Sequence, residues 1–145
     1  YEGYRNHRHL YDDPSKSVDQ NVKRRMLVGR DITPQKHADL LSKRQDHQLI
    51  FKNAMADFDA LITPTIIEPA PKLDEIDEDF TPGHFTRPFN YIDMSALALP
   101  IAYSSNGLPT SLQIVVPAGQ EDYVVQMGTA LESALALNKQ PNLTP

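Results

Sequence analysis

The sequence predicts an α/β fold in which α-helices cover part of a mixed β-sheet. One observation is that a long helical pattern runs directly into a short apolar stretch, DALITPT (59–65), as expected where a helix leads into a buried strand. Another is that two apolar runs, LALPIAYS (97–104) and LPTSLQIVV (108–116), flank the dipeptide Asn106-Gly107. That dipeptide is a turn signal typical of a β-hairpin.

The composition bounds the size of the fold. With 145 residues, 40% of them hydrophobic, the chain has the length of one ordinary domain and enough apolar residues for a core. We therefore expect residues 1–145 to form a single unit. The chain begins at Tyr1 without an initiator methionine, which leads us to expect a segment of a longer protein.

Charge and cysteine content exclude several kinds of chemistry. The formal net charge of −5 argues against a nucleic-acid partner, which usually requires a broad basic surface. Without cysteine there is no disulfide, thiolate nucleophile or thiolate metal site. No apolar run approaches the roughly 20 residues that span a bilayer, and no secretory signal is visible. We expect a soluble, cytoplasmic protein without a membrane partner.

Two helices are predicted in the first half of the chain. The first has Asp13 as its N-cap, Pro14 at its first position and Gly29 as its stop. The second has Thr33 as its cap and Pro34 at its first position, and should be about 35 Å long. Its expected apolar face follows a three-or-four spacing and consists of Leu40, His47, Phe51, Ala54 and Phe58.

Prolines, a glycine and an acidic run without periodicity fill residues 68–85. This composition predicts a long surface loop, which could rim a pocket or simply be mobile. A last helix is predicted from residue 121, ending near Asn138 and Pro141. Its apolar face should carry Val124, Met127, Leu131 and Ala134.

The serine pair Ser104-Ser105 could be a nucleophile or the corner of the hairpin. A serine nucleophile needs a base to accept its proton and donors to hold the oxyanion. The surrounding sequence offers neither, whereas serine is favoured in turns for its local hydrogen bonds. The pattern favours the turn.

The histidines and the basic cluster have both a chemical and a structural interpretation. His7 and His9 have a spacing that a strand could turn into a metal-binding pair, but no third ligand follows in rhythm. His47 and His84 are compatible with a base or with a hydrogen-bonded side chain. The cluster VKRR (22–25) is typical of a solvated helix face. We expect no metal site and no cofactor.

Four segments in order resemble the C-terminal part of the amidase signature enzymes. They are LYDDPSKSVDQNVKRRMLVGRDIT (10–33), DFDALITPT (57–65), TRPFNYIDMSALALPIA (86–102) and GLPTSLQIVV (107–116). Together with the closing helix, they span nearly the whole chain. The ordered set carries the resemblance more than any one motif does.

The resemblance implies an enzyme that hydrolyses or transfers amides through a Ser, cis-Ser, Lys triad. That triad would lie in an N-terminal half that this chain lacks, so no catalytic residue is assigned here. The resemblance implies that Tyr4, Arg25 and Asn90 contribute to substrate binding. A guanidinium at Arg25 suits a substrate carboxylate, although a place on a solvated helix face is equally compatible with its sequence context.

The chain departs from the family pattern at two places. Residues 90–94 are bulkier and more acidic than the short Gly-containing turn of many relatives. Gly83 and His84 stand where the subunits of tRNA-dependent amidotransferases tend to carry an acid. The interpretation is therefore a small-molecule amidase, partnered by the N-terminal half of the same enzyme and open to assembly with further copies. The alternative is a non-catalytic binding or structural module.

Overall fold

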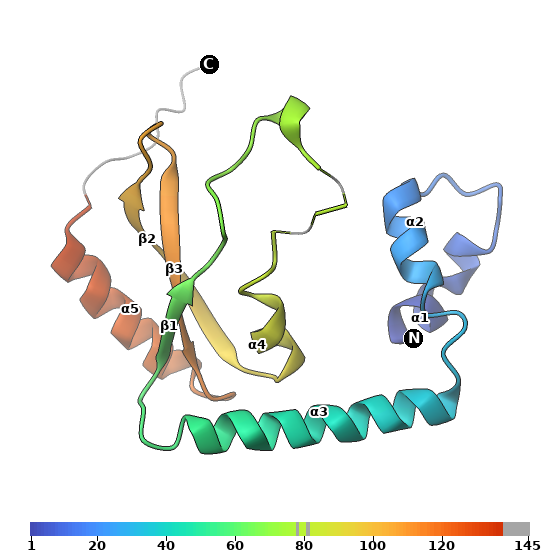
Figure 1. Cartoon of the computed structure of the whole chain (residues 1–145), viewed down its shortest axis with the longest axis horizontal. Helices are drawn as coiled ribbons and strands as arrows, with labels where there is room; N and C mark the ends of the chain where they lie inside the picture. The colour runs from blue at the N-terminus through green and yellow to red at the C-terminus, as the bar shows by residue number, and fades with distance from the viewer. Residues whose placement is uncertain (78, 81, 138–145) are drawn as a thin grey trace. The chain divides into compact units, whose positions relative to one another are not determined.

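The computed structural model describes residues 1–77, 79–80 and 82–137 (Figure 1). The chain divides into two compact units, residues 1–46 and 47–145. The sequence analysis predicted a single unit. The boundary between the two units instead falls inside the longest helix of the chain.

The first unit begins with a helix that the sequence analysis did not predict, α1 (Glu2–Tyr11). The next helix, α2 (Gln20–Leu27), starts later than predicted because the carboxylate of Asp19 caps it, accepting from the backbone N–H of Val22 at 2.9 Å. Asp13 instead accepts from the backbone N–H of Ser15 at 2.9 Å. The assignment of Asp13 as a helix cap was therefore wrong, because its carboxylate closes a local turn.

Gly29 follows α2 and is buried. A Cβ atom at this position would lie 2.7 Å from the backbone nitrogen of Tyr1 and 3.0 Å from Cβ of Tyr4. The glycine therefore ends the helix, as predicted, and also admits the close approach of α1.

The long helix α3 (Pro34–Ala54) begins where the sequence placed it. The backbone N–H of Lys36 donates to Oγ1 of Thr33 at 3.1 Å, which confirms Thr33 as the cap. The helix ends before Phe58, however, and none of its residues is buried. The predicted apolar face is thus only partly correct: Phe51 packs against a core cluster, whereas Leu40 is 41% exposed.

The second unit is built on a three-stranded sheet of β1 (Leu61–Pro64), β2 (Ser95–Tyr103) and β3 (Pro109–Val116). The strand order is β1-β3-β2, and both pairs are antiparallel. Helices and a sheet together confirm the α/β class. β1 is not the buried strand that we predicted, because it lies at an edge and leaves Ile62 58% exposed.

The hairpin between β2 and β3 is confirmed. Gly107 has φ +77°, and its N–H donates to the carbonyl of Ser104 at 2.9 Å. The N–H of Ser104 donates to the carbonyl of Leu108 at 2.8 Å. Of the predicted Asn106-Gly107 pair, only the glycine takes the left-handed conformation, which glycine adopts without steric cost.

Helices cover the two faces of the sheet unequally (Figure 1). The long helix α5 (Glu121–Leu135) packs on one face, where Val124 joins Ile114 and Val116 in a buried cluster. The short helix α4 (Arg87–Tyr91) lies against the other face. α5 ends at Leu135, and the predicted end markers Asn138 and Pro141 lie outside the described residues.

The described part of 66–86 contains one short 3₁₀ helix, η1 (Leu73–Glu75), and otherwise turns and irregular backbone. Among the described residues, no helix has the length and apolar character needed to cross a membrane.

Candidate functional site

A cavity of about 260 Å³ lies on the α4 side of the sheet. We call it the threonine pocket. Its polar wall is Thr65, Thr86, Asn90 and Gln113, and its apolar wall is Phe89, Met94, Ala96 and Ala98. No lining residue is ionisable.

The floor of the threonine pocket is one row of side chains across the sheet. Gln113 of β3 pairs with Ala98 of β2 on one side and with Thr63 of β1 on the other. Side chains alternate between the two faces of a strand, so Ala96 and Ala98 share the α4 face with Gln113. Because alanine side chains are small, they leave room above the sheet.

Gln113 is the polar anchor of this floor. It is 3% exposed, and its Nε2 donates to Oγ1 of Thr63 at 2.9 Å and to the carbonyl of Phe85 at 2.7 Å. A weaker contact of 3.4 Å reaches the carbonyl of Pro64. The side chain thereby ties β1 and the segment before α4 to the central strand. The sequence analysis missed it; the available signal was an amide inside the apolar run of β3.

The outer wall of the pocket comes from α4 and the segment before it. Nδ2 of Asn90 donates to the carbonyl of Thr86 at 3.2 Å, and Oγ1 of Thr86 donates to the carbonyl of Gly83 at 3.4 Å. These hydrogen bonds tie the polar side chains of this wall to the backbone of the same segment.

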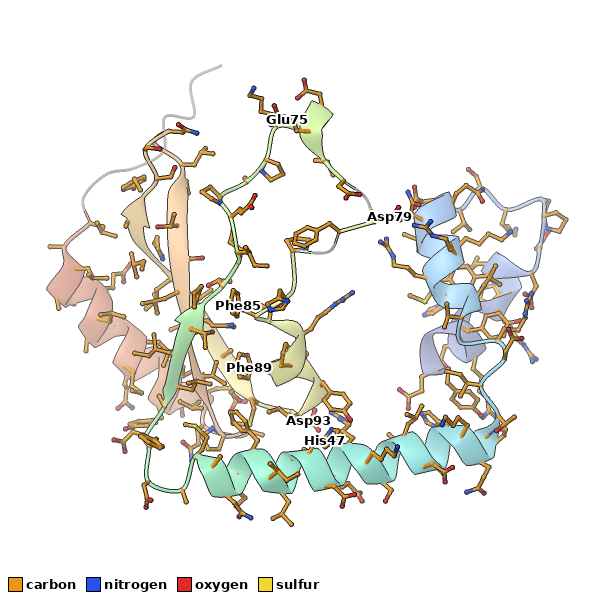
Figure 2. The ribbon with its side chains drawn as sticks, in the orientation of Figure 1. His47, Glu75, Asp79, Phe85, Phe89 and Asp93 are labelled. Carbon is orange, nitrogen blue, oxygen red and sulfur yellow. The ribbon has the colours of Figure 1, made fainter. Side chains whose placement is uncertain are left out.

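The end of α4 is fixed by α3. Asp93 has φ +58°, a conformation that aspartate tolerates better than most side chains. Nε2 of Gln48 donates to Oδ2 of Asp93 at 3.1 Å and to the carbonyl of Ile92 at 3.3 Å. Figure 2 shows Asp93 beside His47 where α4 meets α3. The acidic departure from the family pattern thus occupies the left-handed position of the turn.

Thr65 completes the pocket from the segment after β1. Its backbone N–H donates to the carbonyl of Ser111 at 3.1 Å, which fixes the main chain. Its hydroxyl is buried and has no hydrogen-bond partner within the described residues. A buried polar group without a partner is unfavourable and calls for an explanation.

The three residues that the sequence analysis assigned to substrate binding fall in different units. Asn90 lines the threonine pocket. Tyr4 and Arg25 belong to the first unit, where Arg25 is exposed on α2. The hydroxyl of Tyr4 donates to the carboxylate of Asp12 at 2.7 Å, and this hydrogen bond, followed by burial, raises the pKa of Tyr4.

The histidines lie apart from the pocket lining. His7 and His9 are exposed on α1, where residues two apart do not face each other, so the strand geometry needed for a metal pair is not present. Nδ1 of His47 lies 3.1 Å from the hydroxyl of Tyr91. His84 is exposed and meets Phe85 edge-on, with 5.0 Å between ring centroids. Within the described residues no three potential metal ligands gather.

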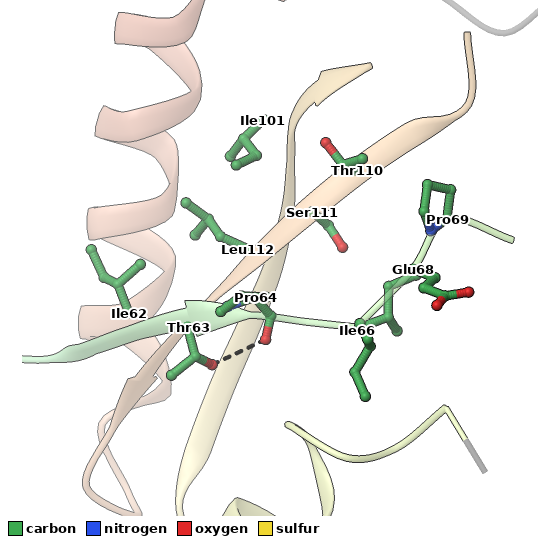
Figure 3. Close-up of a pocket in the computed structure, with 11 residues that line it drawn as sticks. Ile62, Thr63, Pro64, Ile66, Glu68, Pro69, Ile101, Thr110, Ser111 and Leu112 are labelled. Atoms are coloured by element: carbon green, nitrogen blue, oxygen red, sulfur yellow. Dashed lines mark hydrogen bonds between the residues drawn. The ribbon is translucent and has the colours of Figure 1, made fainter. Parts of the chain in front are cut away.

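A second cavity, of about 420 Å³, is mainly apolar (Figure 3). Ile62, Pro64, Ile101 and Leu112 line it, and the single ionisable lining residue is Glu68. A third, of about 740 Å³, lies between the end of α3 and the start of α5. Neither presents a buried polar side chain without a partner, so the threonine pocket has the strongest chemical signature of the three.

The residues that line the threonine pocket lie in the part of the chain that matches a known protein family. The amidase family model matches residues 4–125, and this range includes every residue of the threonine pocket. The chain belongs to the amidase family. The resemblance seen in the sequence is therefore confirmed.

Two groups of amidase-family relatives illustrate the match. The chain is 33% identical over 138 residues to a glutamyl-tRNA(Gln) amidotransferase subunit from Halothermothrix orenii, covering 89% of this chain and 29% of the relative. It is 35% identical over 96 residues to 6-aminohexanoate-cyclic-dimer hydrolase of Pseudomonas sp., covering 55% of this chain and 20% of the relative. The chain thus spans less than a third of the length of these relatives.

Solved structures show the same relation. A crystal structure of an amidase superposes with a TM-score of 0.76 at 29% identity, covering 90% of this chain and 32% of that chain. An allophanate hydrolase variant from Kluyveromyces lactis gives a TM-score of 0.79 at 23% identity, covering 90% of this chain and 22% of that one. The second likeness shows the fold alone.

Proposed function

We propose that the chain is the C-terminal part of an amidase-type hydrolase that acts on a small-molecule amide. The observation that carries this proposal is the threonine pocket, which lies entirely within the residues that match the amidase family. Its four polar residues and uncharged lining suit an uncharged part of the substrate better than a charged one.

The pocket alone cannot hydrolyse an amide. The reaction needs an activated nucleophile, a proton acceptor and oxyanion donors that act together to lower the barrier by about 10 kcal/mol or more. Ser104 uses its backbone and side chain in the hairpin turn, where its Oγ accepts from the N–H of Leu108 at 3.2 Å. A Ser, cis-Ser, Lys triad in an N-terminal half of the enzyme would supply these groups, without a cofactor or metal.

The three candidate binding residues have separate roles in this proposal. Asn90 presents its amide at the threonine pocket and contacts the substrate there. Arg25 offers an exposed guanidinium to a substrate carboxylate, and Tyr4 offers an aromatic surface beside α2. The proposed enzyme is cytoplasmic, and its principal partner is its own N-terminal half.

The test compares this 145-residue chain with a protein extended upstream to include the predicted triad segment, assayed for ammonia release from simple primary amides. Turnover by the extended protein alone supports the proposal. In that protein Asn90→Ala should lower kcat/KM about tenfold or more, while the double change Ser104→Ala and Ser105→Ala should leave it unchanged. Activity of the short chain that the double change abolishes would overturn the proposal.

A second candidate is a component of a tRNA-dependent amidotransferase, favoured by the 33% identity to the glutamyl-tRNA(Gln) amidotransferase relative over 89% of the chain. Ammonia release that depends on a tRNA partner would select it over the small-molecule amidase. A gene that lacks a Gly/Ser-rich segment preceded by a lysine upstream of Tyr1 would instead favour the non-catalytic module.

A further inference from the structure

The dipeptide Asn106-Gly107 at the tip of the β2–β3 hairpin has a chemistry of its own, apart from its role in the turn. In an Asn-Gly pair, the backbone nitrogen of the glycine can attack the side-chain carbonyl carbon of the asparagine, because glycine has no side chain to hinder the approach. Asn106 is the only asparagine in the sequence that a glycine follows.

The surroundings of the pair leave this attack unobstructed. Asn106 and Gly107 are both exposed. Beyond the adjoining residues, no heavy atom lies within 4 Å of the point that a Cβ of Gly107 would occupy. Solvent water therefore reaches the side-chain amide of Asn106 directly.

The hydrogen bonds of the hairpin oppose the attack. The attacking nitrogen must lose its proton, and in the hairpin the N–H of Gly107 donates to the carbonyl of Ser104 at 2.9 Å. The following N–H, that of Leu108, donates to Oγ of Ser104 at 3.2 Å. Ser104 thus holds two successive amides of the turn, and the attack requires a local opening that releases them.

We propose that Asn106 is a site of spontaneous deamidation and that opening of the β2–β3 hairpin sets its rate. The Gly107 nitrogen, after losing its proton to solvent, forms a bond to Cγ of Asn106. The Cγ–Nδ2 bond breaks, and Nδ2 leaves as ammonia with a proton taken from water. Water then hydrolyses the cyclic imide to an aspartate or an isoaspartate at position 106. The net reaction consumes water and releases ammonia.

The products change both the charge and the backbone of the hairpin. Either acid adds a negative charge to a chain whose formal net charge is −5. Isoaspartate also routes the main chain through Cβ and Cγ, and this added length disturbs the spacing of the hydrogen bonds to Ser104. Because β3 is the central strand of the sheet, we expect the isoaspartyl form to unfold at lower urea than the unmodified chain.

The experiment incubates the 145-residue chain at neutral pH, folded or unfolded in guanidinium chloride. Mass spectrometry of the peptide that contains Asn106 follows the mass gain from replacing NH₂ by OH. The unfolded chain should be modified about tenfold faster or more, because no hydrogen bond then restrains the Gly107 amide. Asn53, an exposed asparagine followed by Ala54, is the internal control and should stay unmodified over the same period.

Two serine variants test whether the hairpin sets the rate in the folded chain. Ser104→Ala removes the side-chain acceptor of the Leu108 N–H and should speed the modification about fivefold, as the loss of a typical hydrogen bond predicts. Ser105→Ala makes the same change at the neighbouring exposed serine and should leave the rate unchanged. Asn106→Gln should suppress the reaction, because a larger and less favourable ring would have to form.

The proposal is overturned by equal rates in the folded and unfolded chains, by Ser104→Ala reacting at the wild-type rate, or by Asn53 being modified as fast as Asn106. Deamidation at Asn106 is independent of the proposed amidase function. It yields at most a single ammonia per chain, whereas enzymatic hydrolysis of an added amide continues over many turnovers. The two sources of ammonia are therefore distinguishable in the same assay.

Discussion

The two faces of the three-stranded sheet are covered differently, although each has a buried apolar cluster. On the α5 face, Ile114 and Val116 are almost completely buried and pack against Val124. On the α4 face, the middle of the same central strand presents Gln113, with exposed Ala98 beside it. One strand can contribute to both surfaces because the side chains of consecutive residues of β3 point to opposite faces of the sheet.

The helices explain why the two faces are covered so differently. α5 has 15 residues and α4 has 5. α5 also comes close to the sheet at Gly128, where a Cβ atom would overlap the side chain of Leu97. The small glycine permits a dense apolar layer on this face, whereas the short α4 leaves a hollow on the other. We infer that the α5 face is the more continuous apolar layer, whereas the α4 face combines a buried apolar cluster around Val115 with the threonine pocket.

The largest expected effect comes from Ile114→Ala on the α5 face. Ile114 is 2% exposed, and truncating a buried isoleucine leaves a cavity that costs about 3 kcal/mol or more of unfolding free energy. Its register partner across the β1–β3 pair, Ile62, is 58% exposed and provides a matched control. Ile62→Ala should cost about 1 kcal/mol or less.

Urea unfolding of both variants measures this difference. Equal losses of stability at the two isoleucines would contradict the contrast between a packed face and an open edge.

The next largest effect tests the polar face. Gln113→Leu keeps the volume but removes the donor to Phe85 and Thr63, leaving polar groups without partners, and should cost about 2 kcal/mol. Gln126→Leu, the same change at an exposed position of α5, should change the unfolding free energy by about 0.5 kcal/mol or less. A Gln113→Leu protein as stable as wild type would show that this amide does not hold the pocket together.

The elements with strong local signals were predicted correctly. Thr33-Pro34 marks the start of α3 because capping and a fixed proline φ act within one turn. Gly107 marks the hairpin because its left-handed conformation is a local requirement. The sequence analysis did not predict α1. It placed the start of α2 too early, because Asp13 and Asp19 are both plausible N-caps and only the fold decides between them.

The site was harder to predict than the fold. The family resemblance predicted a substrate-binding role for Asn90; the structure places this residue in the pocket lining, and its role there stays a prediction. Gln113 and Thr65 were not anticipated, since both stand in segments that look purely structural. Their significance depends on contacts between residues far apart in sequence. Gln113 contacts Phe85, 28 residues away, and Thr63, 50 residues away, and periodicity carries no information about such pairs.

The smallest expected effect lies at the edge of the α5 face, where the hydroxyl of Ser95 donates to the carboxylate of Glu121 at 2.6 Å. This hydrogen bond is the main reason that the pKa of Glu121 lies below its ordinary value of about 4.5. A carboxyl group whose pKa is lower in the folded protein than in the unfolded chain stabilises the fold at pH values above its unfolded pKa. This stabilisation is lost as the pH falls through the folded pKa. Ser95→Ala should therefore unfold at slightly lower urea than wild type at pH 7, and the two proteins should converge as the pH falls below 4.5 and through the lowered pKa of Glu121. Glu132→Gln, a change of an exposed acid near the C-terminal end of the same helix, should not lower stability at pH 7, because a negative charge there opposes the helix dipole. The prediction is contradicted if the difference in unfolding free energy between wild type and Ser95→Ala stays constant from pH 7 to pH 3. The effect of Ser95 would then come from packing on the α5 face and not from its hydrogen bond to the charged Glu121.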